Sequence, residues 1–180
     1  MLRKRVIFGT SYVFPNNDDH FALISSVADH FKVHPANVLI VGSAKLGFSI
    51  APKKRYRYFN DRSDIDVVVV SEQLFDEIWW EIHSTAVRRF DWPQRQDFAK
   101  YLMRGWIRPD MFPNINTPRV SNWWNFFTDL SRHVGVRVRG ALFRNWNFLE
   151  SYHGENIQNC ALELALEEPP PDRNWSERQP

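Results

Sequence analysis

The chain has a single cysteine, Cys160, among its 180 residues. One cysteine excludes an internal disulfide framework and is typical of a reducing compartment. Long apolar runs are missing as well. None approaches the roughly 18 residues that cross a bilayer, and the apolar stretch that ends at Gly9 is too short for a signal-peptide core. We therefore expect a cytoplasmic protein with no membrane partner.

An excess of charge of either sign is also missing. The sequence carries 23 basic and 21 acidic residues, a net charge of +2. A balance this small is not typical of proteins that bind nucleic acid through their overall charge, although it allows a locally basic patch. Aromatic residues, in contrast, are abundant: 8 Trp, 5 Tyr and 14 Phe in a chain that is 43% hydrophobic. This content is enough for a real core and excludes a mostly disordered chain.

The spacing of apolar residues predicts an α+β fold, a small mixed β-sheet with helices packed around it. Helical periodicity predicts helices over 16–31, 71–90, 98–102, 117–130 and 146–164, the last one bent at Gly154. Short apolar runs predict strands over 37–41, 64–70 and 134–143, and loops over 51–63 and 106–116. We expect residues 1–166 to form one domain and the proline-containing residues 167–180 to form a flexible tail.

Two tryptophan pairs fall at helical spacing on apolar faces. Trp79-Trp80 widens the stripe of the helix over 71–90, which is expected to end at Phe90, and Trp123-Trp124 lies on the helix over 117–130. Core packing is the leading interpretation of both pairs, and a partner-binding patch is the alternative.

Two short motifs carry the chemistry of the chain. Gly42-Ser43 follows the first expected strand, and Asp64-Ile65-Asp66 enters the second. Side chains two residues apart on a strand point the same way, so Asp64 and Asp66 present two carboxylates about 6 to 7 Å apart. Such like charges repel unless a cation lies between them, and Mg²⁺ takes carboxylates together with phosphate oxygens. Glycine allows a phosphate to approach the backbone, where amides and the Ser43 hydroxyl can donate hydrogen bonds.

These motifs, in this order and between predicted strands, resemble the signature of the nucleotidyltransferase superfamily of the DNA polymerase beta type. The resemblance covers about residues 37 to 75 and is carried by Ile40-Val41-Gly42-Ser43 and Ser63-Asp64-Ile65-Asp66-Val67. It implies that Asp64 and Asp66 are catalytic and ligate Mg²⁺ in a two-metal site, and that Gly42 and Ser43 hold a nucleoside triphosphate. A nucleoside monophosphate from ATP or another nucleoside triphosphate would pass to an acceptor hydroxyl, and pyrophosphate would leave.

Lys45 lies two residues beyond Ser43. It is a candidate contact for the triphosphate, and an ordinary exposed lysine is the alternative. The resemblance leaves the acceptor open among RNA, a protein, a small molecule and a second nucleotide. Members of the superfamily act in bacterial antiviral defence and in toxin–antitoxin systems, which makes such a setting an expectation for this chain.

A third acidic residue is the main departure from the family pattern. Active members carry it on a later strand, where this sequence offers Arg137 and Arg139. Asp91 and Asp110 are the alternatives, and outright absence would give a weak or inactive enzyme that binds nucleotide or a protein partner. Arg137 and Arg139 themselves are candidates to bind triphosphate or an RNA backbone, or they form a solvent-facing edge.

The expected loop over 51–63 is basic and aromatic together. Its basic residues and its aromatic residues interleave, a composition that suits phosphate contacts and base stacking. The members are Lys53, Lys54, Arg55, Tyr56, Arg57, Tyr58 and Phe59. The alternative is a solvated loop whose aromatic rings pack against the core.

Overall fold

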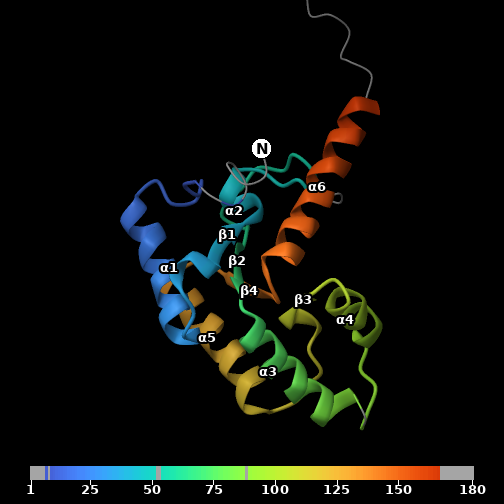
Figure 1. The fold of residues 1–180 in the computed structure, drawn as a ribbon. Helices are drawn as coiled ribbons and strands as arrows, with labels where there is room; N and C mark the ends of the chain where they lie inside the picture. The colour runs from blue at the N-terminus through green and yellow to red at the C-terminus, as the bar shows by residue number, and fades with distance from the viewer. Residues whose placement is uncertain (1–6, 8, 52–53, 88, 167–180) are drawn as a thin grey trace, which may run out of the picture.

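The computed structural model describes residues 7, 9–51, 54–87 and 89–166. Within these ranges the chain is a small mixed sheet with helices around it, so the predicted α+β class is confirmed (Figure 1). The expected tail over 167–180 and Lys53 lie outside the described residues. No helix in the described part of the chain combines the length and the apolar character needed to span a membrane.

The sheet has four strands in the order β1-β2-β4-β3. Their bounds are β1 (Val38–Val41), β2 (Ile65–Val70), β3 (Trp106–Ile107) and β4 (Val138–Phe143). Strand β2 pairs antiparallel with β1 and parallel with β4, and β3 pairs antiparallel with β4. The strand predicted over 134–143 begins only at Val138, because the preceding helix continues to Val134 and ends at Gly135.

Six α-helices surround this sheet in the described ranges: α1 (Asn17–Phe31), α2 (Gly42–Leu46), α3 (Glu72–Ile82), α4 (Arg95–Leu102), α5 (Pro118–Val134) and α6 (Trp146–Leu166). Two 3-10 turns, Pro35–Asn37 and Pro109–Met111, and a π-helical turn, His83–Val87, complete the described elements. Side chains cap the N-termini of α1 and α3, since Asn16 accepts from the amide of Asp18 and Ser71 accepts from that of Leu74. Helix α6 runs through Gly154 as one element.

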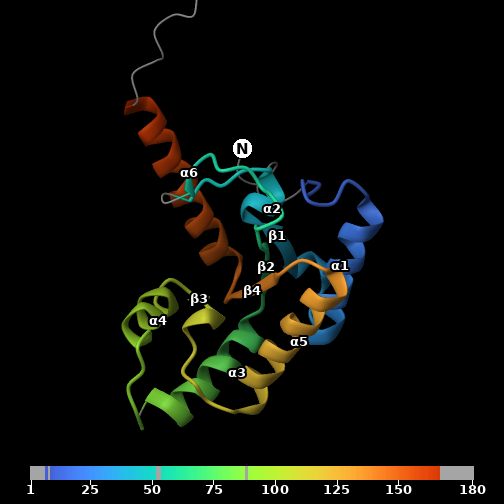
Figure 2. The ribbon, with the colours of Figure 1, turned by 180° about the vertical axis from the view of Figure 1, so that it is seen from behind.

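Helices cover both faces of the sheet, with α1 and α5 on one side and α6 on the other (Figures 1 and 2). The valine run of β2 supplies apolar side chains to both faces of the sheet. Val67 and Val69 pack in the larger cluster with the side chains of α1, α3 and α5, whereas Val68 and Val70 pack with Leu149 of α6. Strand β2 is therefore buried on both faces.

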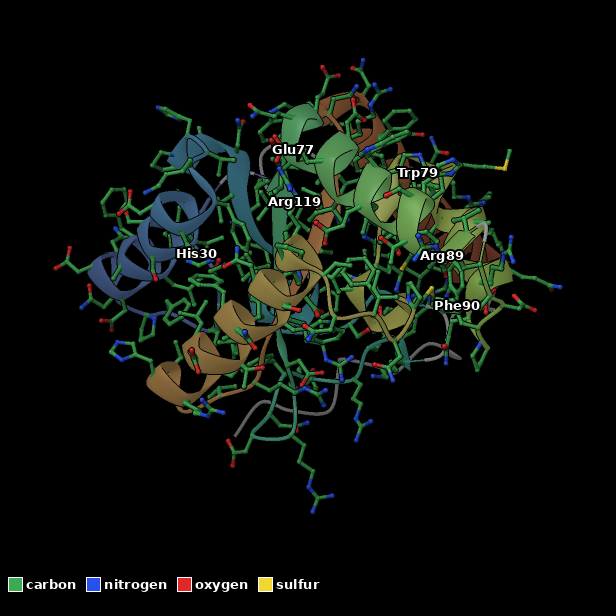
Figure 3. The ribbon with its side chains drawn as sticks, turned by 90° about the horizontal axis from the view of Figure 1, so that it is seen from below. His30, Glu77, Trp79, Arg89, Phe90 and Arg119 are labelled. Carbon is green, nitrogen blue, oxygen red and sulfur yellow. The ribbon has the colours of Figure 1, made fainter. Side chains whose placement is uncertain are left out.

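Side chains of α1, α3 and α5 share one core cluster with Val67 and Val69, and Figure 3 shows these three helices from below. The ring of His30 in α1 stacks on Phe126 of α5 with 4.0 Å between the ring centroids, and its Nε2 lies 3.1 Å from Oδ1 of Asn122. Glu77 of α3 lies beside Arg119 of α5, with 3.0 Å between Oε2 and Nε. Polar and aromatic contacts thus join the helices that cover this face.

The aromatic residues divide between core and surface. Trp123 is buried and Trp79 packs against the core, as the helical spacing predicts. The core interpretation is wrong for Trp80 and Trp124, which are 67% and 45% exposed, because consecutive helical residues point about 100° apart and the second ring of each pair turns toward solvent. It is also wrong for Phe90, which follows the π-helical turn that ends the stripe and is 40% exposed.

Candidate functional site

The turn after β1 meets the start of β2. The antiparallel register pairs Val41 with Asp66, so Gly42 follows at the edge where the aspartates stand. Gly42 has a φ of +66°, and a Cβ added to it would lie 3.1 Å from Oδ2 of Asp66. Both the positive φ and the close approach require glycine at this position. The structure therefore places the Gly42-Ser43 turn against Asp66, which lies 24 residues further along the chain.

Asp64 and Asp66 stand together at the N-terminal end of β2. Asp66 lies on the sheet face that α6 covers, the same face as Val68 and Val70. Burial and, to a smaller extent, the charge of Asp64 raise the pKa of the Asp66 carboxyl to about 6, although the charge of Arg139 opposes both effects. Two carboxylates crowded in this way favour a bound cation.

The cation beside these carboxylates in this structure is Arg139. The parallel register of β2 and β4 pairs Arg139 with Asp66, and its Nε lies 2.8 Å from Oδ2 of Asp64. Arg137 lies further away, with its Nε 3.9 Å from Oδ1 of Asp64. The position on β4 where a third carboxylate is wanted thus holds an arginine that is already paired with the first aspartate.

Neither alternative for the third acid joins the pair. Asp110 binds the guanidinium of Arg108, 2.7 Å away, and Asp91 lies 3.6 Å from Arg95 one helical turn further on. Among the described residues no group of three or more His, Cys, Asp or Glu side chains is placed to hold a metal ion. Two carboxylates suffice for one Mg²⁺ that keeps waters and takes phosphate oxygens. The donor set therefore fits one Mg²⁺ and does not provide the third carboxylate of a two-metal site.

Lys45 lies inside the molecule. Its side chain is buried, and its Nζ donates a hydrogen bond to the carbonyl of Gly9. Burial lowers the pKa of this amine. The expectation of an ordinary exposed lysine is wrong, and the amine that was a candidate for the triphosphate already has a backbone partner.

The basic loop after α2 packs on α6. Arg55 forms an ion pair with Glu163, and the hydroxyl of Tyr56 lies 3.7 Å from Sγ of Cys160. The charge of Lys54 lowers the pKa of Asp66, so the loop lies near the aspartates. Phe59 packs against the core, as the second alternative predicts, whereas Tyr58 is 78% exposed.

His153 is a buried polar group that sequence reasoning gave no role. It lies on the inner side of α6, its ring centroid 6.4 Å from that of Phe143, and burial lowers its pKa to about 4. Its Nε2 has no hydrogen-bond partner among the described residues. The one sequence signal for its burial is its position four residues after Leu149 on the apolar stripe.

Comparison of the chain with protein-family models, with curated proteins and with solved structures found no match.

Proposed function

We propose that this chain binds a nucleoside triphosphate with Mg²⁺ and transfers its nucleoside monophosphate to an acceptor hydroxyl. The observation that supports this function is the register of β1 and β2. It brings the Gly42-Ser43 turn against Asp66, on the strand that also carries Asp64. Two motifs that resemble the nucleotidyltransferase signature in sequence therefore meet in space.

Each residue of the site has a distinct task in this proposal. Asp64 and Asp66 hold the Mg²⁺, which when bound neutralises charge on the phosphates. The backbone at Gly42 admits a phosphate oxygen, and the Ser43 hydroxyl donates to it. Arg139 donates to a second phosphate oxygen once Asp64 binds the metal. The acceptor hydroxyl loses its proton to solvent, its oxygen forms a bond to the α-phosphorus, the bond from that phosphorus to the bridging oxygen breaks, and pyrophosphate leaves.

The test is a transfer assay with α-labelled ATP, Mg²⁺ and a mixture of RNA and protein acceptors. We expect the wild type to release pyrophosphate and label an acceptor, and the double variant Asp64→Asn/Asp66→Asn to lose this activity. The double variant Asp91→Asn/Asp110→Asn removes two exposed carboxyls outside the pair and is the matched control. Full activity of the Asp64/Asp66 variant would contradict the proposed mechanism.

A second candidate function is a nucleotidyltransferase-like module that binds nucleotide or a protein partner with little or no catalysis. The position of Arg139 beside Asp66, where a third carboxylate is wanted, favours it. Calorimetry of ATP with and without Mg²⁺, combined with a pyrophosphate assay, separates the two candidates. Tight binding with no pyrophosphate over hours, in the presence of acceptors, supports the binding module.

A further inference from the structure

Three aromatic side chains are exposed around the turn that follows α2. Tyr58 is 78% exposed, Tyr12 64% and Phe48 36%. We call Tyr12, Phe48 and Tyr58 the aromatic platform. Rings this large are costly to leave in water, and the larger groups of them on a protein surface mark binding sites.

The backbone under the platform is held in place. Phe48 and Tyr58 face each other across an antiparallel bridge, so their side chains stand on the same side of the hairpin. The amide of Tyr56 donates to the carbonyl of Ser49 and that of Phe59 to the carbonyl of Gly47, at 2.8 and 2.9 Å. The platform is therefore formed before any ligand binds, which lowers the entropy cost of binding.

The ring of Tyr12 packs on the backbone of Gly47, next to the other two rings of the platform. A Cβ added to Gly47 would lie 2.9 Å from the ring of Tyr12, so this ring lies directly on the backbone next to Phe48. The same glycine ends α2, the helix that begins at Gly42. A helix of this length spans about 7.5 Å. The platform and the candidate site therefore lie at opposite ends of one short helix.

Exposed arginines accompany the rings. Arg57 lies between Tyr56 and Tyr58 in the hairpin, and Arg62 lies at the turn before β2; both are exposed. Arg137, 68% exposed, lies 3.9 Å from Asp64 at the candidate site. No acidic side chain pairs with Arg57 or Arg62 in the described part of the chain, although Asp61 is adjacent in sequence. Flat rings beside unpaired guanidinium groups match the two parts of a nucleic-acid strand, the base and the phosphate.

We propose that the aromatic platform and these arginines bind single-stranded nucleic acid and present its terminal hydroxyl to the site as the acceptor. Stacking requires bases whose faces are open, which duplexes do not offer. RNA and DNA share this chemistry, and the experiment below distinguishes them. The binding surface stands on its own observations, whereas the assignment of the strand as acceptor rests on the proposed function.

Fluorescence anisotropy with a labelled oligouridine, the matching oligothymidine and a duplex of equal length tests the surface. We expect single strands to bind more tightly than the duplex, with an affinity that falls as salt rises from about 50 to 200 mM. Tyr58→Ala and Phe48→Ala each weaken binding about fivefold or more, and Arg57→Gln reduces the salt dependence. Trp80→Ala, which removes a 67% exposed ring on α3, is the control and leaves binding unchanged.

The outcomes test strand binding by the platform separately from the proposed nucleotide transfer. Asp64→Asn/Asp66→Asn retains strand binding if the surface is assigned correctly, whether or not the chain is a transferase. The assignment of the binding surface is overturned if duplex and single strand bind equally, or if both platform variants keep full affinity. An oligonucleotide that binds but receives no nucleotide, while the wild type labels another acceptor, overturns the acceptor assignment and leaves the proposed function intact.

Discussion

The guanidinium of Arg139 pairs with Asp64, with 2.8 Å between Nε and Oδ2, and the same residue is the register partner of Asp66. One arginine thus neutralises the first carboxylate of the pair and lies beside the second. A metal ion that binds Oδ2 of Asp64 takes the position of this guanidinium. Arg139 and the metal therefore compete for Asp64, and a freed Arg139 lies close to any phosphate that the metal holds.

Replacing Arg139 with glutamine is expected to tighten metal binding in the absence of nucleotide. An exposed ion pair contributes up to about 1 kcal/mol. Arg139→Gln removes both this ion pair and the positive charge that repels a metal ion. We expect the affinity for Mn²⁺, a paramagnetic substitute for Mg²⁺, to rise about fivefold. Electron paramagnetic resonance of Mn²⁺ measures this directly. Arg144→Gln, whose guanidinium pairs with Asp76 at 3.2 Å, is the control. Unchanged or weaker binding in Arg139→Gln would contradict the competition.

Asp66 is expected to make the fold less stable as the pH rises. Its folded-state pKa of about 6 lies above the unfolded value, so the folded chain holds the proton more tightly and loses stability between about pH 4 and 6. Asp66→Asn removes this loss. We expect the variant to be more stable than the wild type by up to about 3 kcal/mol near pH 7, with no gain near pH 4. Urea denaturation across this range checks the trend. A gain that does not vary with pH would be inconsistent with it, and the exposed Asp91→Asn is the control.

His153 is expected to act in the opposite direction. Burial lowers its pKa to about 4, so the unfolded chain binds the proton more tightly and stability is lost as the pH falls from about 6.5 to 4. At about pH 5 this loss is about 2 kcal/mol. His153→Leu keeps the buried volume and removes the titrating group, so it is expected to be more stable than the wild type at pH 5, with a smaller gain at pH 8. His133→Leu, at an exposed position of α5, is the control and lacks this pH-dependent gain.

The elements that the sequence predicts are those whose signals are local. Ser71 and the apolar residues after it define the start of α3 within one turn, and the valine run defines β2. Strand β3 has no local signal, because a strand of two residues has no period. It exists through the pairing of Trp106 with Phe143, 37 positions apart in the chain. The expected loop over 106–116 therefore contains a strand that only the assembled sheet creates.

The candidate site likewise combines residues that the sequence predicts with residues that only the tertiary structure brings together. Glycine after one strand and two aspartates at the start of the next are readable from order and spacing. The partner of those aspartates is not, because the position of Arg139 depends on β4 inserting next to β2 in parallel register. Burial of Lys45 depends on Gly9, whose carbonyl accepts from its amine, and on Tyr12 and Val13, whose amides donate to α2. Sequence thus identifies the carboxylates, and tertiary pairing decides which charges surround them.

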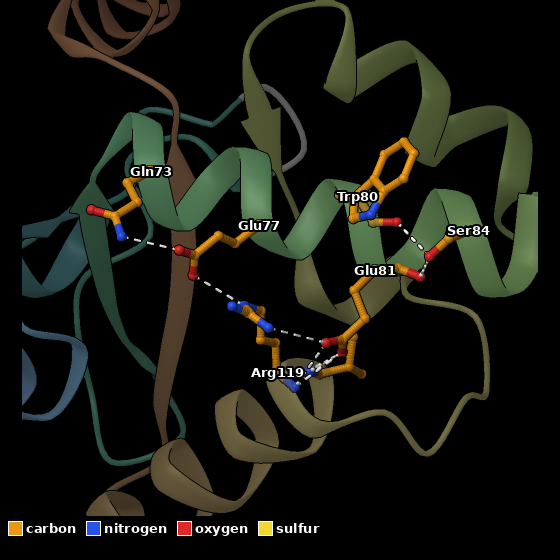
Figure 4. Close-up of polar contacts among 7 residues, drawn as sticks. Gln73, Glu77, Trp80, Glu81, Ser84 and Arg119 are labelled. Atoms are coloured by element: carbon orange, nitrogen blue, oxygen red, sulfur yellow. Dashed lines mark hydrogen bonds and ion pairs between the residues drawn. The ribbon is translucent and has the colours of Figure 1, made fainter.

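The N-terminus of α5 receives its cap from another helix (Figure 4). Thr117 precedes the helix but makes no side-chain capping bond. Instead the carboxylate of Glu81 in α3 accepts from the amide of Arg119 at 3.0 and 3.2 Å and from that of Val120 at 3.1 Å. A second glutamate, Glu77, binds side chains alone: the guanidinium of Arg119 and the side-chain amide of Gln73, which donates to it at 3.0 Å. The two glutamates therefore differ in kind: one satisfies helix N–H groups and the other forms a surface ion pair.

This difference predicts unequal effects of two matched substitutions. Glu81→Ala leaves two helix amides without their carboxylate and removes a negative charge from the positive end of α5, which is expected to cost about 2 kcal/mol. Glu77→Ala removes an exposed ion pair and is expected to cost about 0.5 kcal/mol. For a chain of this size, thermal unfolding should then fall by about 4 to 8 °C for Glu81→Ala and by about 1 to 2 °C for Glu77→Ala. Glu81→Gln, which keeps an acceptor oxygen, is expected to lie between them. Equal losses for the two alanine variants would show that the inter-helix cap adds nothing beyond the ion pair.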